Sequence, residues 1–153
     1  TAMWLAELPS FIPFFLGAII ALLARGHLRS FLMLAIVALS GLHLYLLPGD
    51  VTVTMPFLGY ELVPYRVDAL SVVFGYVFHI AAFISILFSL HVRDTVQHVS
   101  GLLYAGSAIG AIFAGDLLTL FVFWELLAVT SAFLVWAQRT ERAYAVGLRY
   151  LII

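Results

Sequence analysis

The sequence predicts an all-α integral membrane protein with five complete transmembrane helices, the start of a sixth, and the N-terminus outside. Three observations support this fold class. Of the 153 residues, 65% are hydrophobic and only 10% are charged, and the mean hydropathy is +1.15, whereas soluble domains are about 45–50% apolar and about 25% charged. Apolar segments recur at membrane-spanning length. The arginines gather in alternate connections, as the positive-inside rule requires.

The expected spans follow one another with short gaps, and together they make a single transmembrane domain over residues 1–153. A helix that stops after about ten residues reaches only about 15 Å, half of the hydrocarbon thickness. We therefore expect the last segment to be the start of a helix and the chain to be the N-terminal portion of a longer subunit. The predicted segments are 8–24, 28–47, 68–90, 99–114 and 117–137, with a sixth beginning near 143.

Orientation follows from the connections between these segments. Five arginines lie in the first, third and fifth connections, and one lies in the second. This distribution places the odd connections in the cytoplasm. The second connection, 48–67, is long: residues 51–55 alternate in the manner of a strand, 56–59 resemble a turn and 60–63 can return. A short extracytoplasmic hairpin is the expected structure.

Small residues mark one broad face of the fourth predicted helix, where they permit close approach of another helix. They repeat every four residues in two rows: Gly106, Gly110 and Ala114, and Ser107, Ala111 and Gly115. On the next helix, Glu125, Ala128 and Ala132 fall on one stripe. Because the acid shares the small-residue face, we expect it to point into the bundle.

Glu125 is the main candidate functional residue, because a carboxylate near the middle of an apolar membrane segment costs several kcal/mol. The usual reasons for such a residue are a partner charge, a water-filled cavity or a proton that it carries. The alternative is a protonated Glu that only stabilises helix packing through a hydrogen bond.

Three segments resemble the proton-conducting membrane transporter family: VDALS at 67–71, AGDLLTLFVFWELL at 114–127 and GLRYLI at 147–152. That family includes the antiporter-like subunits of respiratory complex I, the large subunits of Mrp-type sodium/proton antiporters, and relatives in membrane-bound hydrogenases. The resemblance covers roughly residues 48–153. It implies a proton path near mid-membrane, with Glu125 at the position of the family's fifth-helix glutamate.

The sequence also departs from the family pattern. In the family, the charge of this glutamate is coupled to a lysine on a later, broken helix, but all seven basic residues here are arginines. The broken helix and the second inverted repeat also have no counterpart in the sequence. The resemblance therefore implies part of one half-channel, working with other membrane subunits of a multisubunit complex in a bacterial or archaeal cytoplasmic membrane.

Two further side chains are candidates for proton or ion translocation. Arg149 lies in the sixth segment at a depth from which it can reach Glu125 through one water, although it can equally extend to the headgroups. His79 lies about eleven residues into the third segment, where an imidazole can pass a proton or serve only in packing. Asp68 and Asp116 are expected to cap the helices that follow them.

Two function classes remain. The first is part of a proton- or cation-translocating subunit, driven by the ion gradient or by redox chemistry in partner subunits, with protons or sodium as the transported ion. The second is a non-transporting scaffold in which Glu125 is structural. No cofactor or metal site is expected, because the sequence has no Cys, no Gly-rich phosphate loop and no metal-ligand spacing among its five histidines. The near-neutral charge of −1 argues against nucleic acid.

Overall fold

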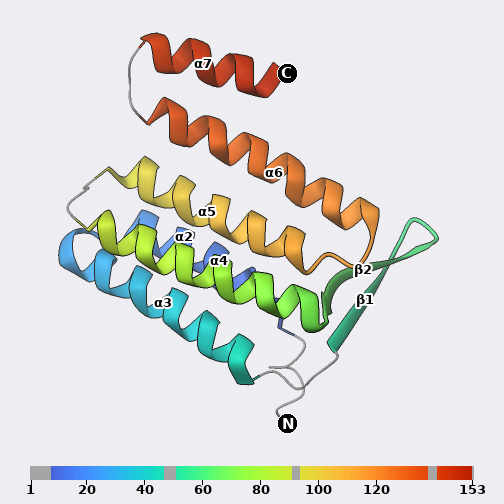
Figure 1. Ribbon diagram of the computed structural model, residues 1–153. Coiled ribbons are helices and arrows are strands. Elements are labelled where there is room, and N and C mark those ends of the chain that lie inside the picture. Colours follow the sequence, from blue (N-terminus) through green and yellow to red (C-terminus); the bar gives the residue numbers. More distant parts are fainter. Residues whose placement is uncertain (1–7, 47–50, 91–93, 138–140, 153) are drawn as a thin grey trace.

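The computed structural model describes residues 8–46, 51–90, 94–137 and 141–152. Within these ranges the chain folds into helices and one hairpin (Figure 1). In chain order the elements are α2 (Ile12–Leu23), α3 (Gly26–Leu46), β1 (Val51–Phe57), β2 (Tyr60–Val67), α4 (Ala69–Phe88), α5 (Thr95–Ile112), α6 (Leu117–Trp136) and α7 (Glu141–Ile152).

The helices lie side by side, and the hairpin lies at one end of the bundle (Figure 1). Helix α5 is central, because it contacts α2, α4 and α6, whereas α7 packs on α6 at the edge. Successive helices run in opposite directions, so that the C-terminal ends of α2, α4 and α6 lie at the end of the bundle opposite the hairpin. By sequence, Arg25, Arg93 and Arg139 fall in the connections that follow these helices, and Arg29 and Arg142 fall near the starts of α3 and α7. Which end is cytoplasmic stays a prediction.

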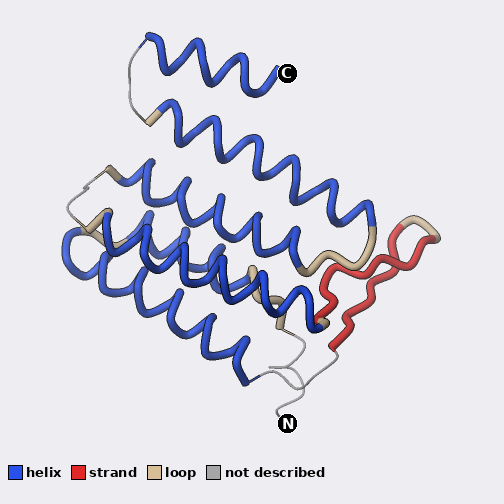
Figure 2. Tube along the Cα trace, in the orientation of Figure 1, coloured by secondary structure: helices blue, strands red, loops and turns tan. Residues whose placement is uncertain are grey.

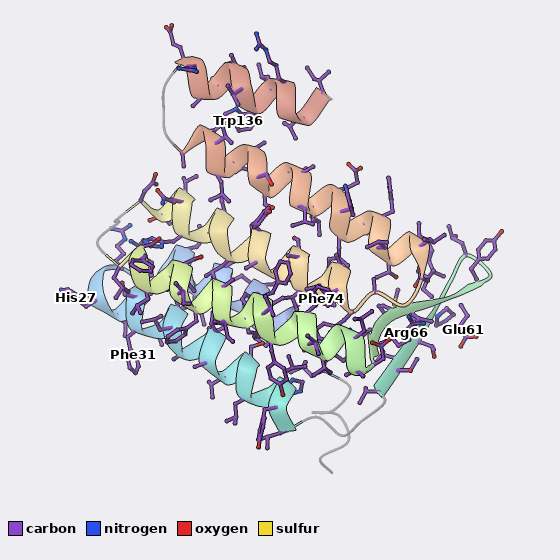
Figure 3. All side chains as sticks on the ribbon, viewed as in Figure 1. His27, Phe31, Glu61, Arg66, Phe74 and Trp136 are labelled. Carbon is purple, nitrogen blue, oxygen red and sulfur yellow. The ribbon has the colours of Figure 1, made fainter. Side chains whose placement is uncertain are left out.

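The expectation of five complete spans is not supported. In the part of the chain that the structure describes, three helices have the length and hydropathy to cross a membrane: α3, α4 and α6. Together with the many exposed leucine, valine and phenylalanine side chains, they identify an integral membrane protein. Phe31, for example, projects outward from α3 (Figure 3).

The other two expected spans fall short for different reasons. Helix α2 has 12 residues, about 18 Å of length, because it begins only at Ile12, with a proline in its first turn. Helix α5 has 18 residues, but polar side chains such as Gln97 and Ser100 and its glycines lower its hydropathy. It begins at Thr95, earlier than the predicted 99, because Asp94 accepts a hydrogen bond from the N–H of Val96.

The predicted hairpin is confirmed, with longer strands than expected (Figure 2). Strands β1 and β2 pair antiparallel from Val51 opposite Val67 to Phe57 opposite Tyr60. The turn is shorter than predicted, because β1 continues through Phe57. Leu58 and Gly59 both have positive φ, 49° and 82°, as a two-residue type I′ loop requires. Residues 47–50 lie outside the described residues.

The small residues of α5 act as the sequence predicts. A side chain at Gly106 would lie 2.9 Å from Cβ of Phe14 on α2, and one at Gly110 would run into the ring of Phe123 on α6. Helices α2 and α6 therefore approach the α5 backbone closely, and α5 is clamped between their aromatic side chains.

Candidate functional site

Strand β2 fixes the start of α6, the helix that carries Glu125. The backbone N–H of Gly115 donates to the carbonyl of Val63 at 2.8 Å, and the N–H of Arg66 donates to the carbonyl of Phe113 at 2.7 Å. Figure 3 shows Arg66 and Glu61 on the hairpin beside this loop. A side chain at Gly115 would collide with the side chain of Val63. The position therefore requires glycine, and the hairpin holds the α5–α6 loop.

Asp116 caps α6, as predicted. Its carboxylate accepts hydrogen bonds from the N–H of Thr119 at 2.8 Å, from the hydroxyl of Thr119 at 2.7 Å and from the N–H of Val63 at 2.6 Å. Burial raises the pKa of this carboxyl, but these hydrogen bonds outweigh it and leave the pKa below its ordinary value. The cap thus joins α6 to the hairpin as a charged group.

Asp68 caps α4 in the same way. Its side chain accepts from the N–H of Ser71 at 2.8 Å, and the hydroxyl of Ser71 in turn accepts from the N–H of Asp68 at 2.9 Å. This reciprocal pair is a capping box. The hydrogen bonds from Ser71, with a smaller contribution from the nearby Arg66, lower the pKa of Asp68.

Glu125 is exposed in the described structure, so the expectation that it points into the bundle is corrected. The buried residues of α6 include Thr119, Phe123 and Thr130, which face α5. Glu125 comes two residues after Phe123, a rotation of about 200° that carries it to the opposite face. The described residues place no helix over it.

The predicted stripe of Glu125, Ala128 and Ala132 is nevertheless real, and its burial changes along its length. Ala132 is fully buried, Ala128 is half-buried and Glu125 is exposed. Ala132 lies nine residues after Phe123, which places it about 180° from Phe123 around the helix axis. Its burial therefore comes from the side opposite α5, where α7 packs. The stripe faces α7, and Glu125 lies at its uncovered end.

Helix α7 is fixed against the C-terminal end of α6 by Trp136 (Figure 3). The indole N–H donates to the carbonyl of Tyr144 at 3.2 Å, and the two rings stack with centroids 6.1 Å apart. A side chain at Gly147 would run into the indole. Arg149, farther along α7, is exposed, and the described residues contain no ion pair between Arg149 and Glu125.

His79 is buried, with 5% of its surface exposed, and it lies on the other side of α5 from Glu125. Its Nε2 is 2.7 Å from the hydroxyl of Ser40 on α3, and its Nδ1 is 2.7 Å from the carbonyl of Gly75. The ring of Phe14 packs against the imidazole in a T-shaped arrangement, with centroids 5.3 Å apart. The structure therefore does not bring the three predicted site residues together.

Sequence reasoning did not identify the polar groups around His79. Ser40 also lies 3.3 Å from the carbonyl of Ser10, and the hydroxyl of Ser10 is 2.8 Å from the hydroxyl of Tyr65 on β2. Ser10, Ser40 and Tyr65 are almost completely buried, and burial raises the pKa of the Tyr65 phenol in spite of its bond to Ser10. Serines are common in membrane helices, so only the tertiary contacts identify this cluster.

A cavity of about 350 Å³ opens between α4 and α5. Its lining is mostly apolar, with Ser89, Gln97 and His98 among the polar residues, and it contains neither Glu125 nor His79. The described residues contain no cluster of three or more His, Cys, Asp or Glu side chains that could hold a metal ion.

No family model matches the sequence, and no curated protein matches it. Among solved structures, the chain is similar to one from the membrane-bound sulfane sulfur reductase (MBS), an archaeal respiratory membrane complex, with a TM-score of 0.82 and 18% sequence identity. The match covers 94% of this chain and 24% of that one, so this chain spans about a quarter of its length. The two share a fold over nearly all of the present sequence.

Proposed function

We propose that this chain is part of a proton- or cation-translocating, antiporter-like subunit of a multisubunit membrane complex, with Glu125 as the carboxylate that carries the proton. One observation carries the proposal: Glu125 lies near the middle of α6, on a part of its face where most of the neighbouring side chains are apolar and exposed. Its neighbours on that face are Leu118, Phe121, Val122 and Val129, all exposed.

A carboxylate in that position has to be covered in the assembled protein. Facing lipid, it would cost about 3 kcal/mol on insertion-type scales. Among the described residues it makes no hydrogen bond or ion pair, so hydrogen bonding within these helices does not account for it. Further helices that enclose Glu125 with a partner charge or with water would supply the environment that a proton carrier needs.

The shared fold supports an assembly of this kind. The similar chain belongs to a respiratory membrane complex and is about four times as long as the present sequence. In a subunit of that length, further helices would be available to cover the exposed face of α6. Redox chemistry in partner subunits and an ion gradient are both compatible drivers, and a single carboxylate suits both protons and sodium.

Arg149 is proposed as a positive charge near the path. It lies about 12 Å along α7 from Glu141, and Glu125 lies about 16 Å from the end of α6 that faces this point. The two residues are thus at similar depths on neighbouring antiparallel helices.

Two variants of the full subunit, in its assembled complex, test the role of Glu125. Glu125→Gln keeps the shape and removes the exchangeable charge, whereas Glu125→Ala removes both. Transport in proteoliposomes, followed with a pH-sensitive dye, should be largely lost in both variants while the complex stays assembled. Glu141→Gln makes the same change at the exposed start of α7 and should leave transport unchanged.

The scaffold alternative gives a different pattern. If Glu125 is structural, the Gln variant should transport normally, because an amide still donates and accepts hydrogen bonds. Glu125→Ala should then loosen helix packing by about 0.6 kcal/mol, the average size of a membrane interhelical hydrogen bond. Full transport by the Gln variant would refute the proposed role.

A further inference from the structure

We propose that His79 is a proton-binding site inside the bundle and that Ser40 is its positioning residue, which reverses its own hydrogen bond when the imidazole gains a proton. The inference rests on the proposed function in one respect only: that the proton bound at His79 takes part in translocation. The site itself is defined by the contacts of α2, α3 and α4, on the other side of α5 from Glu125.

The hydrogen bonds fix the tautomer of the neutral ring. The carbonyl of Gly75, 2.7 Å from Nδ1, has no hydrogen to donate, so Nδ1 must carry the proton. Nε2 is then unprotonated and accepts. Its neighbour at 2.7 Å is the hydroxyl of Ser40, which therefore donates to it. In this state the single hydrogen of Ser40 is not available to the carbonyl of Ser10.

Protonation reverses the second bond. The added proton binds Nε2, which becomes a donor to Oγ of Ser40. The hydroxyl hydrogen of Ser40 then turns to the carbonyl of Ser10, 3.3 Å away. Ser40 keeps its own hydrogen throughout, and the heavy atoms stay in place. Each protonation state therefore has a partner for both ring nitrogens and for the hydroxyl, which is the requirement for holding a buried cation reversibly.

The chain of hydrogen bonds from His79 through Ser40 ends at the backbone carbonyl of Ser10. A backbone carbonyl accepts a hydrogen bond but has no proton to pass on, so the bond between Ser10 and Tyr65 does not extend a proton wire to the hairpin. The cluster stores one proton at His79. Along α4, this position is about 15 Å from the start of the helix at Ala69, near the middle of the span.

The surroundings explain why Ser40 matters. On α2 the imidazole meets the ring of Phe14 in a T-shaped contact, and on α3 the titratable neighbour is His43, whose positive charge would oppose one on His79. Tyr65 on β2 lies beyond Ser10. Hydrogen bonds to a charged group are about twice as strong as neutral ones, so Ser40 favours the charged imidazole more than the neutral one.

The test is a titration of histidine in the full-length subunit within its assembled complex, held in lipid nanodiscs. Nitrogen-15 NMR of labelled histidine gives the protonation state, and the spectrum of His79→Gln identifies the His79 signal. Ser40→Ala should weaken proton binding at His79 about fivefold, the loss expected when a charge-assisted hydrogen bond is removed. Ser40→Thr keeps a hydroxyl at this position, so proton binding at His79 should be as strong as in the native protein.

Two matched serine variants complete the design. Ser107→Ala removes a buried hydroxyl that donates to the carbonyl of Leu103 on α5, and it should leave the titration of His79 unchanged. Ser10→Ala keeps the backbone carbonyl, and it should also have no effect. An effect of Ser10→Ala as large as that of Ser40→Ala would show a hydroxyl wire toward Tyr65 and overturn the storage site.

The proposal also fails if Ser40→Ala titrates like the native protein, or if His79 takes up no proton between about pH 5 and pH 8, the range in which imidazole titrates. These outcomes are separate from the transport test. Normal transport by Glu125→Gln would remove the proposed function and leave the titration of His79 as it is. An unaffected Ser40→Ala would remove this site and leave Glu125 untouched.

Discussion

Helices α5 and α6 are neighbours of similar length, with 18 and 20 residues, yet their environments are opposite. Helix α5 buries eight residues, including His98, Ser100 and Ser107. Helix α6 is the more apolar of the two and buries four. In a membrane, hydropathy does not draw a helix to the centre, because lipid is as apolar as leucine. Small and polar side chains select α5 as the central helix, and the large apolar side chains face outward.

Glu125 is the exception to this division, since it places a carboxylate on the apolar outer face of α6. That face is consequently the surface where this chain most needs a partner.

The largest effect is expected at Glu125 when α6 is studied alone. In an isolated α6 segment, Glu125→Leu should favour membrane insertion by about 3 kcal/mol, because it removes a carboxylate from the helix centre. The fraction inserted into microsomal membranes measures this. Thr130→Leu should favour membrane insertion by about 1 kcal/mol or less, because the hydroxyl of Thr130 already donates to the carbonyl of Leu126. Equal gains in both variants would mean that the carboxylate carries no special cost.

A smaller effect is expected where α5 and α6 touch. Gly110→Ala would push a methyl group into the ring of Phe123 and should lower the free energy of unfolding by about 2 kcal/mol. Gly101→Ala, on the same helix with no atom within 4 Å, should be neutral or stabilise by up to about 1 kcal/mol. Reversible unfolding in mixed micelles compares them. If the two variants have the same stability, the α5–α6 contact is looser than described.

The smallest effect is expected at the cap of α6. Asp116→Ala should cost about 1 kcal/mol of stability, the typical value of a helix N-cap. The pKa of Asp116 is lowered in the folded state, so its contribution is present above the unfolded pKa of about 3.9 and is lost as the pH falls through the folded value. Unfolding measured against pH should show this acid-side loss in the native chain and a weaker one in Asp116→Asn.

Much of the candidate site was beyond sequence reasoning for physical reasons. The position of Glu125 in an apolar segment is evident in the sequence, but the direction that it faces depends on which helices pack against α6. The pattern of small residues on α5 correctly predicted close packing at Gly110. It did not predict that Phe123 would fill that contact and turn Glu125 to the opposite side.

The sequence by itself determined the membrane class, the β-hairpin, and the caps at Asp68 and Asp116, because composition, strand alternation and capping act over a few neighbouring residues. Tertiary structure decided the rest. It shortened the expected first span to α2, made α5 the central helix, left Glu125 exposed and joined His79 to Ser40 from another helix. These features depend on contacts between residues far apart in the chain, and no local pattern encodes such contacts.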